Sequence, residues 1–328
     1  MRFGIIGTGN IAVRLARSCA FVENATLDGV YGRTKEHVLS FAEKFNIPHT
    51  YDSVEALLDS GVDAVYIALP HGLHKEAAIR ALNKGIAVLC EKPAGLNFKE
   101  VEEMVQAAKA NNTVFMEAMK TRFEPAYIEL KKEVERGVIG KVKKILLSDC
   151  FKLDPALYGH TYHTEKGQGG CLLDCGCYCL SWAEDYAGIP ERVEIKEVKL
   201  MNGVDMYVRA ALIYPDCAID VECGFDRKLP QTAVLMGSEG TVEVDMLHRP
   251  QGYLLCEKDN EKDISLPAEH DDMYGEIAHF VSLVERGEKE SDVMPYAASL
   301  NIARISDMIR IALNEDEHCV NMVGFEQK

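Results

Sequence analysis

The chain has 328 residues, which is long enough for two domains of ordinary size, each with its own core. Lys and Arg number 36 against 52 Asp and Glu, so the formal net charge is −16 and the surface repels nucleic acid phosphates and anionic membranes. With 47% hydrophobic and 27% charged residues, the composition is typical of a soluble globular protein. Nucleic acids and membranes are therefore excluded as expected partners.

The N-terminus runs directly into a strand-like segment, "RFGII", without a long apolar stretch or a small-residue cleavage site. No stretch approaches the roughly 18 apolar residues of a membrane span. The 11 cysteines are irregularly spaced, and without an export signal they predict reduced thiols. We expect a cytoplasmic protein.

The first part of the chain alternates short apolar runs with segments that carry apolar residues at helical spacing. Near-continuous apolar strands that alternate with helices predict a doubly wound parallel sheet covered on both faces. The predicted strands are residues 2–6, 25–31, 62–69, 86–91 and 113–118.

The pattern changes after about residue 123, where a helix is followed by strands with few helices between them, and two helical segments close the chain. This order predicts an α+β domain with a mostly antiparallel sheet. We expect a dinucleotide-binding domain over 1–122 and a substrate-binding and oligomerisation domain over 123–328. The strands predicted in this part are residues 141–151, 193–200, 206–214, 218–225, 232–237 and 241–245.

A glycine-rich turn follows the first predicted strand and opens a helix, which is the context that a dinucleotide site requires. In this GxGxxA sequence, Gly7 allows the tight turn, Gly9 lets the backbone approach a pyrophosphate, and Ala12 permits close packing of helix on strand. The alternative is a glycine turn that binds nothing. The cofactor-binding residues predicted here are Gly7, Thr8, Gly9, Asn10 and Ile11.

The end of the second strand indicates which dinucleotide is bound. NAD sites usually place an acidic residue there, whereas NADP sites use an arginine. Here Arg33 and Thr34 occupy the position, and Asp28 falls inside the strand. The donors of a guanidinium suit a phosphate, so NADP(H) is the preferred cofactor and NAD(H) the alternative.

Seven segments in order, "GIIGTGNIA", "ALPHGLH", "CEKP", "MEAMKTRFEPA", "GGCLLDCGCY", "GSEGTVEVD" and the terminal helices, resemble the Gfo/Idh/MocA family of oxidoreductases over nearly the whole chain. The glucose–fructose oxidoreductase and dimeric dihydrodiol dehydrogenase branch is the most similar. The resemblance implies a Rossmann domain followed by a domain with a large open sheet, one face of which often forms an oligomer interface. A homodimer or homotetramer through that sheet is therefore expected.

The resemblance also implies site residues in the first domain. Lys92 of Glu91-Lys92-Pro93 is expected beside the nicotinamide and the substrate hydroxyl, at the end of a parallel strand where such folds bind ligands. His71 stands where many relatives carry asparagine, and Lys120 replaces a tryptophan that the branch often has. The further residues expected near the cofactor are Leu69, Pro70, His71, His74, Glu91 and Arg122.

In the second domain the family pattern reads roughly GG-x-LLD-x-G-x-H, and this chain has Asp174 and then Tyr178 in place of the histidine. Positions four apart share a helix face, so both side chains can reach one substrate. A tyrosine with a pKa near 10 is only about 0.1% ionised at pH 7, and a nearby ammonium favours the phenolate. We predict that Tyr178 is the proton acid/base, Lys92 its electrostatic partner and Asp174 a substrate-orienting acceptor. The alternative for Tyr178 is a structural hydrogen bond.

The loop 151–170 is polar and aromatic, and His160, Tyr162 and His163 are candidates to bind sugar hydroxyls or ordinary surface residues. Four cysteines lie between Cys171 and Cys179, and three of them share one helical stripe, where cysteine packs as a small hydrophobe. A metal site is not expected, since no second ligand pair is present.

The sequence thus predicts an NADP-dependent oxidoreductase that transfers a hydride between the nicotinamide and a sugar, polyol or related cyclic hydroxyl compound. A dihydrodiol or xylose dehydrogenase-like enzyme is the first alternative. A dinucleotide-binding sensor without turnover is the second, because fold alone does not establish function.

Overall fold

The computed structural model describes residues 1–257, 260–315 and 320–322, and its chain divides into two compact units. The first consists of Met1–Arg122 and Ala268–Leu300, and the second of Phe123–Pro267 and the described residues from Asn301 on. The sequence predicts a single boundary at residue 122, which places residues 268–300 in the second domain. The difference arises because the chain returns to the first unit, which a boundary drawn along the sequence cannot show.

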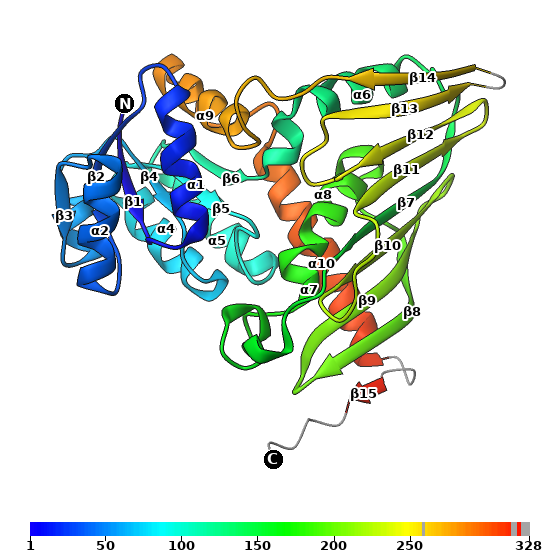
Figure 1. Cartoon of the computed structure of the whole chain (residues 1–328), viewed down its shortest axis with the longest axis horizontal. Helices are drawn as coiled ribbons and strands as arrows, with labels where there is room; N and C mark the ends of the chain where they lie inside the picture. The colour runs from blue at the N-terminus through cyan, green and yellow to red at the C-terminus, as the bar shows by residue number, and fades with distance from the viewer. Residues whose placement is uncertain (258–259, 316–319, 323–328) are drawn as a thin grey trace. The chain divides into compact units, whose positions relative to one another are not determined.

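The first unit is built on a six-stranded parallel sheet in the order β3-β2-β1-β4-β5-β6, with helices along it (Figure 1). The five predicted strands are confirmed. The three-residue β3 was not predicted, because it is too short and too polar to give an apolar run. The strands are β1 Arg2–Ile6, β2 Thr26–Tyr31, β3 His49–Tyr51, β4 Ala64–Ile67, β5 Ala87–Glu91 and β6 Phe115–Ala118.

Helices that pack apolar side chains inward connect these strands. In α1, for example, Ala12, Leu15 and Ala16 are buried, at the spacing of one helical face. The strand order reverses between β1 and β4, and ligands of such folds bind beyond the carboxyl ends of the strands at this point. The helices are α1 Asn10–Ser18, α2 Lys35–Phe45, α3 Val54–Leu58, α4 His74–Asn83, α5 Phe98–Ala110 and α9 Tyr274–Arg286, with 3-10 turns at Cys19–Phe21, His71–Leu73 and Lys120–Phe123.

The second unit contains a nine-stranded sheet in the order β14-β13-β12-β11-β7-β10-β9-β8-β15. Neighbouring strands are antiparallel except at β10–β7 and β15–β8, which confirms the mostly antiparallel sheet. The strands are β7 Val142–Cys150, β8 Arg192–Met201, β9 Val204–Ile213, β10 Ala218–Gly224, β11 Thr232–Gly237, β12 Gly240–Asp245, β13 Gly252–Glu257, β14 Asn260–Ser265 and β15 Val320–Met322.

Helices pack against the middle of this sheet (Figure 1). Trp182 is fully buried there. Its ring centroid lies 4.6 Å from that of Tyr127 and 5.7 Å from that of Tyr186, and its indole N–H donates a hydrogen bond to the Leu247 carbonyl oxygen. The helices are α6 Pro125–Glu135, α7 Cys171–Asp174 and α8 Gly176–Ala187, while α10 Tyr296–Glu315 begins in the first unit and continues in the second.

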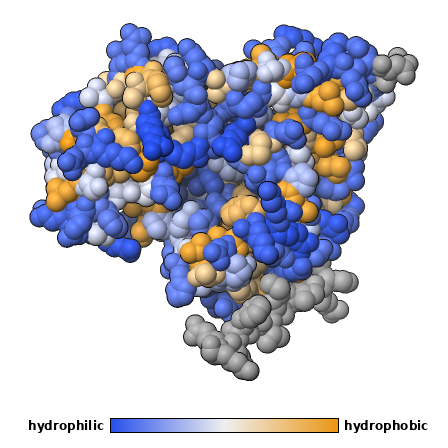
Figure 2. All heavy atoms as spheres, in the orientation of Figure 1, coloured by the Kyte–Doolittle hydropathy of each residue, from blue (hydrophilic) through white to orange (hydrophobic). Residues whose placement is uncertain are grey.

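Hydrophilic residues cover much of the face shown in Figure 2, with smaller hydrophobic areas among them. Within the described residues, no helix is both long and apolar enough to cross a membrane.

Candidate active site

In the glycine turn after β1, Gly7 is required by the fold, whereas Gly9 is not. Gly7 has φ +112°, and a Cβ at this position would lie 2.2 Å from the Ala68 carbonyl oxygen, so the fold itself requires glycine. Gly9 has φ −76°, which any residue adopts. A Cβ at Gly9 would meet no described atom within 4 Å. Gly9 therefore leaves a space before the start of α1, where a pyrophosphate binds in this type of fold.

Arg33 and Thr34 lie just beyond the end of β2 and are both exposed. They are close to the glycine turn, since a Cβ built at the neighbouring Gly32 would lie 3.1 Å from Thr8 Oγ1. Asp28 lies in the middle of β2. The side chain at the tip of this strand is thus a cation, as expected for a site that receives a phosphate.

The turn Glu91-Lys92-Pro93 follows β5, and its Lys92–Pro93 peptide bond is cis. Tyr66 donates a hydrogen bond to the buried Glu91 carboxylate, which also accepts one from the Lys92 backbone N–H at 3.2 Å. Burial raises the pKa of Glu91, although Tyr66 and the charges of Lys92 and Lys120 oppose this effect. Glu91 fixes the backbone from which the half-buried Lys92 extends.

Two more buried side chains hold this turn. His74 is fully buried, with Nε2 at 2.8 Å from the Leu69 carbonyl oxygen and Nδ1 at 2.9 Å from that of Pro93. Burial lowers the pKa of His74, against the effect of these two carbonyl groups. Glu117 on β6 accepts a hydrogen bond from the Ala94 N–H at 2.9 Å. The segment after β4 and the turn after β5 are therefore linked through His74.

His71 is also buried, and its ring lies edge-on to that of His74 with centroids 5.8 Å apart. Pro70 precedes the 3-10 turn that carries His71. Arg122 is buried after β6, where its charge acts on Glu117. Of the residues predicted near the cofactor, His74 and Glu91 thus bind backbone groups of the turn after β5.

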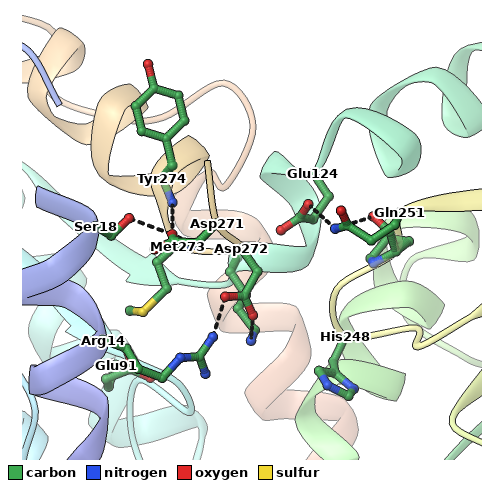
Figure 3. Close-up of polar contacts among 12 residues, drawn as sticks. Arg14, Ser18, Glu91, Glu124, His248, Gln251, Asp271, Asp272, Met273 and Tyr274 are labelled. Carbon is green, nitrogen blue, oxygen red and sulfur yellow. Dashed lines mark hydrogen bonds and ion pairs between the residues drawn. The ribbon is translucent and has the colours of Figure 1, made fainter. Parts of the chain in front are cut away.

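Sequence reasoning missed Asp272, which binds two cations of the first unit. Its carboxylate accepts from Arg14 on α1 and from the buried Lys120 after β6 (Figure 3). Burial alone would raise the pKa of Asp272, but the hydrogen bond from Arg14 and the charge of Lys120 hold it well below its usual range. Neighbouring Asp271 accepts from the backbone N–H groups of Met273 and Tyr274 at the start of α9. No sequence motif marks this pair of acids.

In the second unit, Asp174 and Tyr178 do not lie on one continuous helix as predicted. A break at Cys175 ends α7 and begins α8, because the Tyr178 N–H bonds to the Cys175 carbonyl oxygen, three residues earlier. Both side chains are nearly buried, Asp174 with 8% and Tyr178 with 9% of its surface exposed. Each side chain is therefore mostly buried but keeps a small accessible surface, which suits a group that contacts a bound substrate.

The loop 151–170 brings His163 to Asp174, with 3.6 Å between Nε2 and Oδ2. The Tyr162 ring stacks on His163 at 4.0 Å, and Tyr162 and His160 are exposed. The sequence does not distinguish among the three aromatic candidates of this loop. The structure places His163 against the carboxylate and Tyr162 behind it.

The turn before α7 is closed by a carboxylate from β9. Asp205 accepts a hydrogen bond from the Leu172 N–H at 2.7 Å, and a Cβ at Gly170 would lie 2.2 Å from its Oδ1. The thiols below this turn are buried, and Cys171 Sγ is 3.8 Å from Cys223 Sγ. The ten cysteines among the described residues are free thiols, and no group of three or more His, Cys, Asp and Glu side chains there is arranged to hold a metal ion.

Comparison with known proteins defines the class. A model described as an oxidoreductase family with an NAD-binding Rossmann fold matches residues 1–119, and the GFO/IDH/MocA C-terminal domain matches residues 127–243. The protein is thus built as an oxidoreductase with a Rossmann domain. The chain belongs to the GFO/IDH/MocA family.

Among its relatives, a scyllo-inositol 2-dehydrogenase (NADP(+)) of Bacillus subtilis is 35% identical over 325 residues, 94% of this chain and 96% of that protein. A trans-1,2-dihydrobenzene-1,2-diol dehydrogenase of Mus musculus is 32% identical over 95% of this chain and 97% of its own length. Among solved structures, an aldose-aldose oxidoreductase from Caulobacter crescentus has a TM-score of 0.87 at 21% identity, covering 96% of this chain and 98% of that chain. This last likeness shows the fold.

Proposed function

We propose that this protein is an NADP(H)-dependent oxidoreductase that acts on a hydroxyl group of a sugar, polyol or related cyclic compound. The observation that carries the proposal is the open space at Gly9 next to the exposed Arg33, because together they fit a dinucleotide with a 2′-phosphate. The cofactor supplies a hydride donor or acceptor at its nicotinamide. The similarity to an NADP(+)-dependent inositol dehydrogenase supports the same choice.

The residues of the first unit hold the cofactor in this proposal. Gly9 admits the pyrophosphate, and the backbone N–H groups of Asn10 and Ile11 at the start of α1 donate to it. Arg33 and Thr34 bind the 2′-phosphate. Leu69, Pro70 and His71, beyond the end of β4, line the nicotinamide side.

Three residues act on the substrate. Lys92 binds the reacting hydroxyl and supplies positive charge, from a turn that His74 and Glu117 hold rigidly. Tyr178 gives a proton to the oxygen of a ketone that is being reduced, or removes it from an alcohol that is being oxidised. Asp174, with His163 beside it, accepts a hydrogen bond from a neighbouring hydroxyl.

The experiment measures NADPH absorbance against a panel of aldoses, inositols, diols and the corresponding ketones. Lys92→Ala and Tyr178→Phe are expected to lower kcat at least a hundredfold, which is the usual scale for loss of a proton-transfer group. Two matched controls are expected to keep activity: Lys84→Ala, in an exposed ion pair, and Tyr214→Phe, which removes a hydrogen bond to the Gly188 carbonyl oxygen at the end of α8. Binding of NADPH without turnover of any substrate would contradict the proposal and favour a sensor.

Cofactor choice is tested separately. Arg33→Ala is expected to raise KM for NADP(H) at least tenfold and to change KM for NAD(H) less than threefold, because only NADP carries the 2′-phosphate. Lys35→Ala, an exposed cation two residues later, is the control. Equal effects of Arg33→Ala on both cofactors would contradict the assigned role.

We also propose that the chain forms a homodimer or homotetramer through the sheet of the second unit. The proposed interface is the face of the sheet that points away from α7. Cys223 on β10 contacts Cys171 of α7, so the adjacent Glu222 belongs to this opposite face. On it, Tyr207 donates a hydrogen bond to Glu222, and the Arg227 guanidinium lies 3.6 Å from the Tyr207 ring centroid. Light scattering coupled to gel filtration tests this, and a monomer at micromolar concentration would contradict it.

A further inference from the structure

The loop after β12 holds His248 in a fixed position (Figure 3). Met246 has φ +54°, which turns the chain sharply. The next residue, Leu247, is anchored on both sides: its N–H donates to the Gln231 carbonyl oxygen at 2.9 Å, and its own carbonyl oxygen accepts from Trp182 Nε1 at 2.9 Å. The buried indole thus fixes the backbone that presents His248.

One side of His248 faces a buried carboxylate. Asp149, near the end of β7, is 2% exposed, and its Oδ2 lies 3.5 Å from His248 Nδ1. Gln231 Nε2 donates to its other oxygen at 2.5 Å. A buried carboxylate is stable only with such partners, and it favours a proton on Nδ1, the imidazole nitrogen that faces it. Nε2 lies on the opposite side of the ring.

The other side of His248 faces Tyr178. The two ring centroids are 5.5 Å apart and the planes meet at 40°, so the rings are in contact. Phenol, imidazole and carboxylate therefore follow one another from α8 through the β12 loop to β7. All three belong to the second unit.

We propose that Asp149 and His248 form a positioning pair for Tyr178, in which the imidazole held by Asp149 stabilises the phenolate that remains when Tyr178 gives up its proton. This inference rests on the proposed role of Tyr178. During reduction the Tyr178 hydroxyl proton passes to the substrate oxygen while the hydride reaches the carbon, and the phenolate takes up one proton from water afterwards. During oxidation the phenolate accepts the hydroxyl proton as the hydride leaves the carbon for the oxidised cofactor, and Tyr178 afterwards releases this proton to water. The imidazolium form of His248 is compensated by Asp149 in both directions.

Further titratable groups border this pair among the described residues. The thiols of Cys150, Cys175 and Cys179 are buried around Asp149, and burial together with its negative charge raises their pKa, so they stay neutral near pH 7. Asp174 lies one turn before Tyr178, and His163 of the preceding loop lies 3.6 Å from its carboxylate. His248 is thus the partner that we assign to Tyr178 within the second unit.

The test compares pH profiles of kcat/KM in the oxidation direction for wild type, His248→Asn and His248→Phe. Asparagine keeps a donor for Asp149, and phenylalanine keeps the ring contact. Both variants are expected to shift the acidic limb, on which the rate rises as Tyr178 ionises, to higher pH by about one unit and to lower kcat at pH 7 about tenfold, with KM for NADP(+) unchanged. Asp149→Asn is expected to shift the profile in the same direction. The control is His279→Asn, which alters a half-buried histidine bonded to Ser291 in the first unit.

A purely structural role would lower thermal stability in these variants and leave the pH profile in place, and this result would overturn the inference. A Tyr178→Phe enzyme with wild-type turnover would instead overturn the proposed function. Loss of activity in Tyr178→Phe with an unshifted profile in His248→Asn would remove only the role of His248. The two failures are therefore distinguishable.

Discussion

Two glycine turns lead into helices in this chain, one before α1 in the first unit and one before α7 in the second. Gly7 and Gly170 both have strongly positive φ, +112° and +118°, and at both a Cβ would lie 2.2 Å from an oxygen atom. Beyond this the turns differ. The N–H of Leu172 in α7 is bonded to the Asp205 carboxylate, whereas the turn before α1 ends in Gly9, which has no side chain to cap the helix.

The difference teaches how to distinguish a helix start that serves folding from one that serves binding. The first N–H groups of any helix need an acceptor. In α7 and in α9 the chain supplies it, from Asp205 and from Asp271. At α1 the small residue and the adjacent space leave room for an acceptor from outside, such as the dinucleotide phosphate that we propose to bind there.

The largest effect on stability is expected at Asp272, next to the capping Asp271 (Figure 3). Asp272→Ala leaves the buried Lys120 without its carboxylate and is expected to cost about 3–5 kcal/mol. Urea unfolding at pH 7 measures this. The double variant Asp272→Ala/Lys120→Met should recover much of the loss, and failure to recover would show that the ion pair is not its cause.

The same pair predicts a pH dependence. Because the pKa of Asp272 is lower in the folded protein than in the unfolded chain, its contribution to stability is present above about pH 4 and is lost as the pH falls below that value. The difference in unfolding free energy between wild type and Asp272→Asn should therefore shrink between about pH 4 and pH 3. A difference that stays constant over this range would contradict the prediction.

The closed turn of the second unit is tested by Gly170→Ala. The added methyl group meets the bonded Asp205 carboxylate, and the backbone there is nearly exclusive to glycine, so we expect a loss of about 2–3 kcal/mol. Gly137→Ala is the matched control. It also has positive φ, +82°, but no described atom within 4 Å of the new Cβ, and it should cost about 1 kcal/mol.

The open turn of the first unit is tested by Gly9→Ala. Its Cβ occupies space rather than meeting protein atoms, so the melting temperature should stay within about 2 °C while KM for NADP(H) rises at least tenfold. Gly7→Ala, which meets the Ala68 carbonyl oxygen, should instead lower the melting temperature strongly. Similar melting curves for both variants would erase the distinction between the two glycines.

The smallest effect is expected for thiol modification. Burial raises the pKa of Cys171, Cys175 and Cys179, so these thiols stay protonated and inert in the folded protein. Among the ten cysteines of the described residues, iodoacetamide at pH 8 should label the partly exposed Cys217 and Cys256 first, with activity unchanged. Mass spectrometry locates the label. Early labelling of Cys175 would indicate that the turn before α8 opens.

The sequence by itself determined the parallel sheet, the six strands from 141 to 245, the glycine turn and the family. Each strand and the glycine turn depend on residues within a dozen positions of one another, where hydrophobic period and turn chemistry act directly, and the family resemblance rests on several such segments in order. It did not predict β13 and β14: β14, Asn260–Ser265, is almost entirely polar and has no apolar run to mark it. Its position at the edge of the sheet makes this polarity compatible with a strand.

Only the tertiary structure decided which side chains complete each site. It brings Asp205 to Leu172 across 33 positions, Asp149 to His248 across the sheet, and Asp272 to Arg14 across 258 positions. A buried carboxylate needs hydrogen-bond partners, and these can come from any part of the chain. Such contacts produce no periodic pattern in the sequence, so the sequence does not predict them. The sequence therefore predicts a place for the cofactor, while the groups packed around Lys92 and Tyr178 become visible only in the folded protein.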